Sequence, residues 1–146
     1  MRAYEKLLII NFAACEGGKS RIDYPVQHSL VFYLTERGFK FPAVYDFIPT
    51  TWADYGDILM SRELESDLSM LVARGSLALT HGSPFISMTE AGIAEAKPLA
   101  QKLEEEGEKY QDLKDTIVEA LTYEQRVFLQ QCYRMYIQKE YLVARG

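Results

Sequence analysis

The segment from residue 61 to residue 89 constrains the fold of this chain most, because it joins a capped helix directly to a tight β-hairpin. Ser61 is a natural N-cap, and the leucines after it recur at helical spacing until Gly75. Two short alternating runs, SLALT and FISMT, follow, with a glycine and a proline between them. The sequence therefore predicts a helix over 61–74 and a hairpin over 76–89.

Apolar periodicity and end signals predict four further helices. They cover residues 3–15, 25–37, 90–121 and 123–142. The first is apolar on most of its faces, which predicts a buried helix and leaves a strand over 7–12 as the alternative. Pro98 is expected to kink the helix over 90–121, and Gly107 is a point at which that helix can break. The helix over 123–142 opens with a capping-box pattern from Thr122 to Gln125.

The stretch AACEGGKS contains half of a phosphate-binding loop pattern. Gly18, Lys19 and Ser20 match the second half of that pattern. Ala13 stands where the first glycine is needed, and Pro25 marks a helix start several residues after the lysine instead of at it. EGGKS therefore predicts a turn that ends the first helix, not a nucleotide site.

Residues 39–60 have no clean period and contain two prolines, which predicts an extended connector. Aromatic side chains are concentrated in it, and large aromatic residues are enriched in protein interfaces. The candidates for a protein interface are Tyr45, Phe47, Trp52 and Tyr55. The alternative is that these rings pack the connector onto the domain. In that case Trp52 is the ring most expected to remain available for an interface.

The order of helix, connector, helix, hairpin and helix is that of a winged helix-turn-helix. The chain also resembles the uncharacterised YwgA-like group of winged-helix proteins, which carry a Leu-x-x-Asp-Leu helix and a Thr-Glu-x-Gly step after the wing. The matching positions are Tyr55, Gly56, Ser61, Leu64, Asp67, Leu68, Gly75, Thr89, Glu90 and Gly92. The expected fold is α+β and mostly α, with a winged-helix domain and its two-stranded wing over 1–95. A helical extension, or C-terminal helical arm, is expected over 96–146.

The second helix of a helix-turn-helix enters the major groove, so its exposed charges bear directly on DNA binding. Residues 41–90 carry two basic and seven acidic side chains, whereas residues 1–40 carry six basic and four acidic ones. The net charge of −5 also has the wrong sign for a surface that grips nucleic acid throughout. The candidates for DNA contact are Lys19, Arg21, Arg62, Arg74 and the wing residue His81. The alternative is that they are ordinary solvated charges.

Two functions are expected from these patterns. The first is a cytoplasmic winged-helix transcriptional regulator that binds double-stranded DNA as a homodimer, with the helical extension supplying the dimer contact. The second is a winged-helix adaptor or antitoxin-like protein that has lost DNA binding and acts through protein–protein contacts. The alternative to dimerisation is that the extension forms a self-contained helical hairpin.

No enzyme activity, cofactor, metal or membrane contact is expected. The two histidines and the two distant cysteines have no metal-ligand spacing, and the chain contains no nucleophile motif. No apolar run reaches the length of about 20 residues that spans a bilayer.

Overall fold

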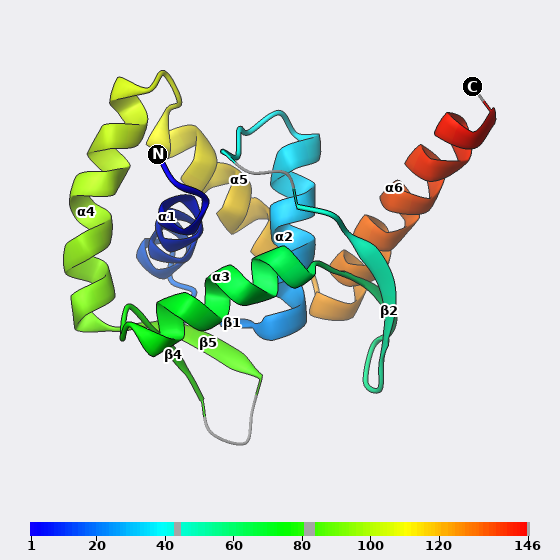
Figure 1. Ribbon diagram of the computed structural model, residues 1–146, viewed down its shortest axis with the longest axis horizontal. Helices are drawn as coiled ribbons and strands as arrows, with labels where there is room; N and C mark the ends of the chain where they lie inside the picture. Colours follow the sequence, from blue (N-terminus) through cyan, green and yellow to red (C-terminus); the bar gives the residue numbers. More distant parts are fainter. Residues whose placement is uncertain (43–44, 81–83, 146) are drawn as a thin grey trace.

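The helix α1 (Ala3–Glu16) is surrounded by other elements of the fold (Figure 1). The structure is a computed structural model that describes residues 1–42, 45–80 and 84–145. Every residue of α1 from Lys6 to Ala14 is buried, because α3, α4 and α5 all pack against this helix. The predicted buried helix is confirmed, and the alternative of a strand is wrong.

A turn after α1 leads into a short strand and the second helix. The Lys19 N–H donates to the Ala14 carbonyl at 2.9 Å, and Gly18 takes a φ of +92°, which confirms EGGKS as a helix-ending turn. β1 (Arg21–Asp23) follows, so no helix opens at the lysine. α2 (Tyr24–Glu36) begins next, with proline in its first turn, as predicted.

The predicted helix and hairpin over residues 61–89 are both confirmed. They form α3 (Arg62–Ala73), β4 (Leu77–Leu79) and β5 (Phe85–Met88). β5 also pairs with β1 in an antiparallel manner, which gives a three-stranded sheet in the order β1-β5-β4. Ile22 and Ile86 face each other across the β1–β5 pair, and both are buried. The hairpin is therefore anchored to the strand that precedes α2.

The prediction of an extended connector over 39–60 is wrong for its second half. β2 (Ile48–Trp52) and β3 (Gly56–Met60) form a second antiparallel hairpin. Its sequence does not alternate, because β3 contacts both α2 and α6, so the neighbouring residues Ile58 and Leu59 are both buried. This burial on two sides explains why apolar and polar residues do not alternate in the sequence of β3.

Three helices complete the chain: α4 (Glu90–Glu105), α5 (Tyr110–Thr122) and α6 (Gln125–Arg145). The helix predicted over 90–121 breaks at Gly107, whose φ is +89°. α4 and α5 pack against α1, whereas α6 packs against α2 and β3. The described residues thus form an α+β fold that is mostly helical, with two small antiparallel sheets. Among these residues, no helix combines the length and the apolar character that crossing a membrane requires.

The predicted capping box from Thr122 to Gln125 is wrong. Thr122 is the last residue of α5, and its hydroxyl donates to a carbonyl within that helix. The Glu124 carboxylate caps α6 instead, because it accepts the amide hydrogens of Arg126 and Val127, both at 3.1 Å. A carboxylate at this end of a helix also interacts favourably with the helix dipole.

Ser61→Ala tests the cap of α3. The Ser61 hydroxyl accepts the Leu64 amide hydrogen at 3.3 Å, so alanine leaves this N–H without its partner. The free energy of unfolding, measured by urea denaturation, is expected to fall by about 1 kcal/mol. Ser66→Ala, at an exposed position of the same helix, should change it by less than about 0.5 kcal/mol. Equal losses in the two variants would contradict the capping role.

Candidate functional site

The residues predicted to contact DNA are divided among separate places. Lys19 and Arg21 line the same cavity, which has a volume of about 460 Å³ and lies beside the turn between α5 and α6. Arg62 and Arg74 lie at opposite ends of α3. His81 lies outside the described residues. Among the candidates that the structure describes, it therefore brings together only Lys19 and Arg21.

Arg74 is engaged within the protein. Its guanidinium forms an ion pair with Glu95 of α4 and lies 5.0 Å from the centre of the Tyr4 ring. The hydrogen bond to Glu95 raises the pKa of Arg74. A phosphate that approached Arg74 would have to compete with these contacts, so Arg74 links α3 to α1 and α4.

The exposed face of α3 is acidic. Glu63 and Glu65 are exposed in its first turn, where Arg62 is the one exposed basic residue. Carboxylates are favourable at the N-terminal end of a helix because of its dipole. The same carboxylates repel phosphate groups, so this face is electrostatically unfavourable for entry into a DNA groove.

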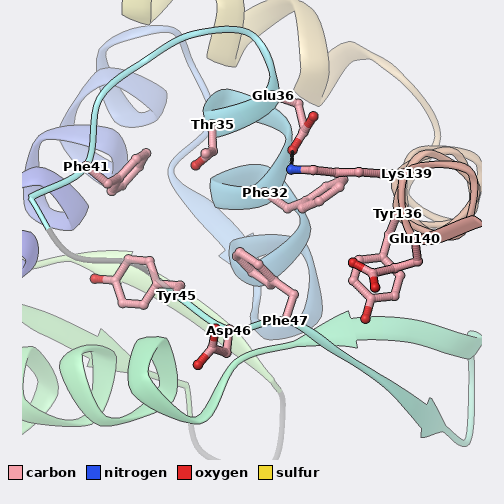
Figure 2. A pocket seen from close by; sticks show the side chains of 10 residues that line it. All are labelled: Phe32, Thr35, Glu36, Phe41, Tyr45, Asp46, Phe47, Tyr136, Lys139 and Glu140. Carbon is pink, nitrogen blue, oxygen red and sulfur yellow. Dashed lines mark hydrogen bonds and ion pairs between the residues drawn. The ribbon is translucent and has the colours of Figure 1, made fainter. Parts of the chain in front are cut away.

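A pocket of about 520 Å³ lies between α2, the segment leading into β2, and α6 (Figure 2). We call it the aromatic pocket, since five of its ten lining residues are phenylalanine or tyrosine. The ten residues are Phe32, Thr35, Glu36, Phe41, Tyr45, Asp46, Phe47, Tyr136, Lys139 and Glu140. Two of the predicted interface residues, Tyr45 and Phe47, therefore come together in one cavity.

The rings of the aromatic pocket are fixed by edge-to-face packing. Phe32 lies 5.5 Å from Phe47 and 6.2 Å from Tyr136 of α6, measured between ring centroids. Phe41 and Tyr45 form a second edge-to-face pair at 6.1 Å. Figure 2 shows these two rings on one side of the pocket and the Phe32–Phe47 pair facing them. Such packing holds aromatic side chains in defined orientations, so the walls are preformed.

The Tyr45 hydroxyl is directed toward α3. It donates a hydrogen bond to the Asp67 carboxylate at 2.7 Å. Burial, followed by this hydrogen bond, raises the pKa of Tyr45 well above its usual range. Tyr45 thus presents its apolar ring to the pocket while its polar atom is satisfied elsewhere.

Charged groups at the aromatic pocket are predominantly acidic. Lys139 Nζ lies 2.7 Å from Glu36 Oε1, so one carboxylate is neutralised by the only ammonium among the described lining residues. Asp46 and Glu140 form no ion pair with another residue in the described ranges. The pocket therefore carries an excess of negative charge beside its aromatic walls.

The other two predicted interface aromatics lie on the β2–β3 hairpin and pack inward. Trp52 contacts Tyr24 of α2 at a centroid distance of 6.2 Å. The Tyr55 hydroxyl donates to Asp23 Oδ2 at 2.8 Å, and burial together with this bond raises the pKa of Tyr55 to about 12. These contacts favour the alternative reading, in which the two rings fasten this segment to β1 and α2.

The last turns of α6 extend away from the rest of the fold (Figure 1). The first half of α6 is packed, with Phe128 and Cys132 buried. In its second half Ile137, Leu142 and Val143 are 43%, 68% and 70% exposed. At about 3.6 residues per turn these three positions lie on different sides of the helix, so the exposed end of α6 is apolar on more than one side. Exposed apolar residues concentrated in one segment are typical of interaction surfaces.

Several residues of the aromatic pocket were not identified from the sequence as part of a site. They are Phe32, Thr35, Glu36, Phe41, Asp46, Tyr136, Lys139 and Glu140. Tyr136 lies within the helix predicted over 123–142. A weak signal existed, since Tyr136, Lys139 and Glu140 lie one helical turn apart and mix an aromatic with charges. Nothing in the sequence indicates that this turn meets α2.

No family model matches the chain, and no curated protein or solved structure is significantly similar to it. Within the described residues, no group of three or more His, Cys, Asp or Glu side chains is arranged to hold a metal ion. The candidate site therefore rests on its own geometry, that of an aromatic pocket beside an exposed apolar helix end.

Proposed function

We propose that this chain is a winged-helix protein that acts by binding another polypeptide. Its binding surface consists of the aromatic pocket and the exposed residues Ile137, Leu142 and Val143 of α6. The observation that carries this proposal is that the pocket and the exposed end of α6 adjoin each other along the same helix. Val143 follows Lys139 and Glu140 by one helical turn, so the side of α6 that lines the pocket continues to an exposed apolar residue, with the exposed Leu142 next to it.

The order of the elements supports a winged helix. Three helices, α1, α2 and α3, are interleaved with a sheet in which the strand before α2 pairs with the hairpin after α3. In a winged helix this hairpin is the wing and α3 is the helix that would read DNA. On this assignment the β2–β3 hairpin is an insertion between the two helices of the reading motif.

The charges on α3 favour a protein partner over DNA. The exposed acids Glu63 and Glu65 lie where a DNA-reading helix would face phosphates, and Arg74 is paired with Glu95. DNA binding stays a prediction. A salt series with labelled duplex DNA of random sequence tests it, because phosphate contacts weaken steeply as salt rises. Binding at low salt that Lys19→Glu and Arg21→Glu abolish would overturn the present proposal.

The protein-binding proposal is tested by disrupting the end of α6. The tagged full-length chain and its Leu142→Asp/Val143→Asp variant are compared in cross-linking and capture from the source organism. Leu79→Asp is the matched control, because Leu79 is an exposed leucine on β4 of the β4–β5 hairpin, away from α6 in the sequence. We expect one partner to be captured by the wild type and the control and to be lost at least tenfold from the α6 variant.

Light scattering on the same purified samples identifies a partner that is a second copy of the chain. A dimer that dissociates in the Leu142→Asp/Val143→Asp variant would assign the surface to the predicted homodimer. Capture that is equal in all three proteins, with no change in mass, would overturn the proposal.

A further inference from the structure

We propose that the aromatic pocket is a cage for the cationic side chain of a lysine or arginine in the partner polypeptide. This inference rests on the proposed protein-binding function and assigns the chemistry that the pocket recognises. The chain uses this chemistry internally as well. The Arg37 guanidinium lies 5.4 Å from the Tyr33 ring and the Arg21 guanidinium 4.6 Å from the Phe85 ring.

The walls of the pocket supply the attraction to a cation. An ammonium or guanidinium within about 6 Å of an aromatic ring centre is attracted by the negative charge over the ring face. Phe41 already has the Lys6 ammonium 5.6 Å from its ring centre. Phe32 also lines the cavity, but it is only 4% exposed. The attraction is therefore assigned to the rings of Tyr45, Phe47 and Tyr136, which line the cavity as well.

The charges of the pocket select the sign of its occupant. Asp46 and Glu140 lie at the cavity without an ion pair among the described residues, and Lys139 is already paired with Glu36. A cationic side chain would be attracted by the negative charge of both carboxylates in addition to the rings. An anionic side chain would be repelled by the same groups, and an apolar one would leave them without a counter-charge.

The surroundings of the pocket favour a polypeptide over a free small cation. A lysine or arginine side chain fits within about 520 Å³ and leaves room for water. Val143 continues the pocket side of α6 and Leu142 is exposed next to it, so a free cation would leave both uncovered. A peptide segment with a basic residue beside apolar ones can fill both parts at once.

The test compares fluorescent peptides that differ at one position. The probes are an alanine–leucine peptide with a central lysine and the same peptide with arginine, norleucine or glutamate at that position. We expect the lysine and arginine peptides to bind at least tenfold more tightly than the other two. The Asp46→Asn/Glu140→Gln variant should lose this preference, whereas Glu105→Gln, which removes an exposed carboxylate on α4, should keep it.

The other results overturn the inference in recognisable ways. Equal binding of all four peptides would remove the cation preference, and a preference that survives Asp46→Asn/Glu140→Gln would place the cation elsewhere. Tetramethylammonium or ethylguanidinium binding as tightly as the lysine peptide would assign the pocket to a free organic cation. A partner lost with Leu142→Asp/Val143→Asp but retained with Asp46→Asn/Glu140→Gln would preserve the proposed function and refute the cage.

Discussion

Glu108→Gln is expected to lower the free energy of unfolding by about 3 kcal/mol, because it leaves a buried ammonium without its counter-ion. Lys6 is only 2% exposed, and its side chain forms an ion pair with the Glu108 carboxylate. Glutamine keeps the shape of the side chain and can still accept the Lys40 amide hydrogen, which lies 3.1 Å away in the wild type. The substitution therefore removes mainly charge. Urea denaturation at pH 7 measures the loss.

Lys6→Met, combined with Glu108→Gln, separates the loss of charge from the loss of packing. Methionine fills most of the volume of the lysine stem and needs no counter-ion, so the double variant should recover most of the stability. The coupling energy in this double-mutant cycle should reach about 2 kcal/mol. Glu105→Gln, an exposed neighbour, should change stability by less than about 0.5 kcal/mol. Losses that simply add would show that Lys6 does not depend on Glu108.

The helices of this fold could be predicted because their signals are local. Ser61 and Gly75 bound α3, and Gly107 breaks the helix predicted over 90–121. The β2–β3 hairpin could not be predicted in the same way, since its pattern depends on α2 and α6, which contact β3 from elsewhere in the chain. The Lys6–Glu108 ion pair is also non-local, because it joins α1 to the turn before α5.

The candidate site could be predicted only in part. Composition pointed to Tyr45 and Phe47, which do line a pocket, but it pointed equally to Trp52 and Tyr55, which pack against Tyr24 and Asp23. Aromatic content alone cannot separate a ring that lines a cavity from one that fastens a hairpin. The rest of the pocket comes from α2 and α6, whose contact depends on the whole fold.

Because of His28, the free energy of unfolding is expected to fall by about 3 kcal/mol as the pH falls from about 6.5 to about 4. The His28 ring is fully buried, and its Nδ1 accepts the Ser61 amide hydrogen at 3.0 Å. A proton on Nδ1 would break this bond and place a charge in the core. Burial therefore lowers the pKa of His28 from 6.5 to about 4.

The direction of the His28 effect follows from the two states. Above pH 6.5 the imidazole is neutral in the folded and unfolded chains, so it adds no pH dependence. Between pH 6.5 and 4 the unfolded chain takes up a proton that the folded chain excludes, and stability is lost as the pH falls. Asp23, whose pKa is raised by burial, acts in the opposite direction, because its protonation favours the folded state.

His28→Asn isolates this contribution, because the amide oxygen can still accept the Ser61 amide hydrogen and does not titrate. Asparagine leaves a small cavity, so the variant should be less stable at pH 7. The measurement is the difference in the free energy of unfolding between pH 7 and pH 4, which should be about 3 kcal/mol larger in the wild type. Asp23 is present in both proteins and cancels from this comparison. His28→Gln repeats the test if asparagine prevents folding. Parallel pH curves for wild type and variant would mean that folded and unfolded chains protonate His28 equally, and that Ser61 does not depend on a neutral imidazole.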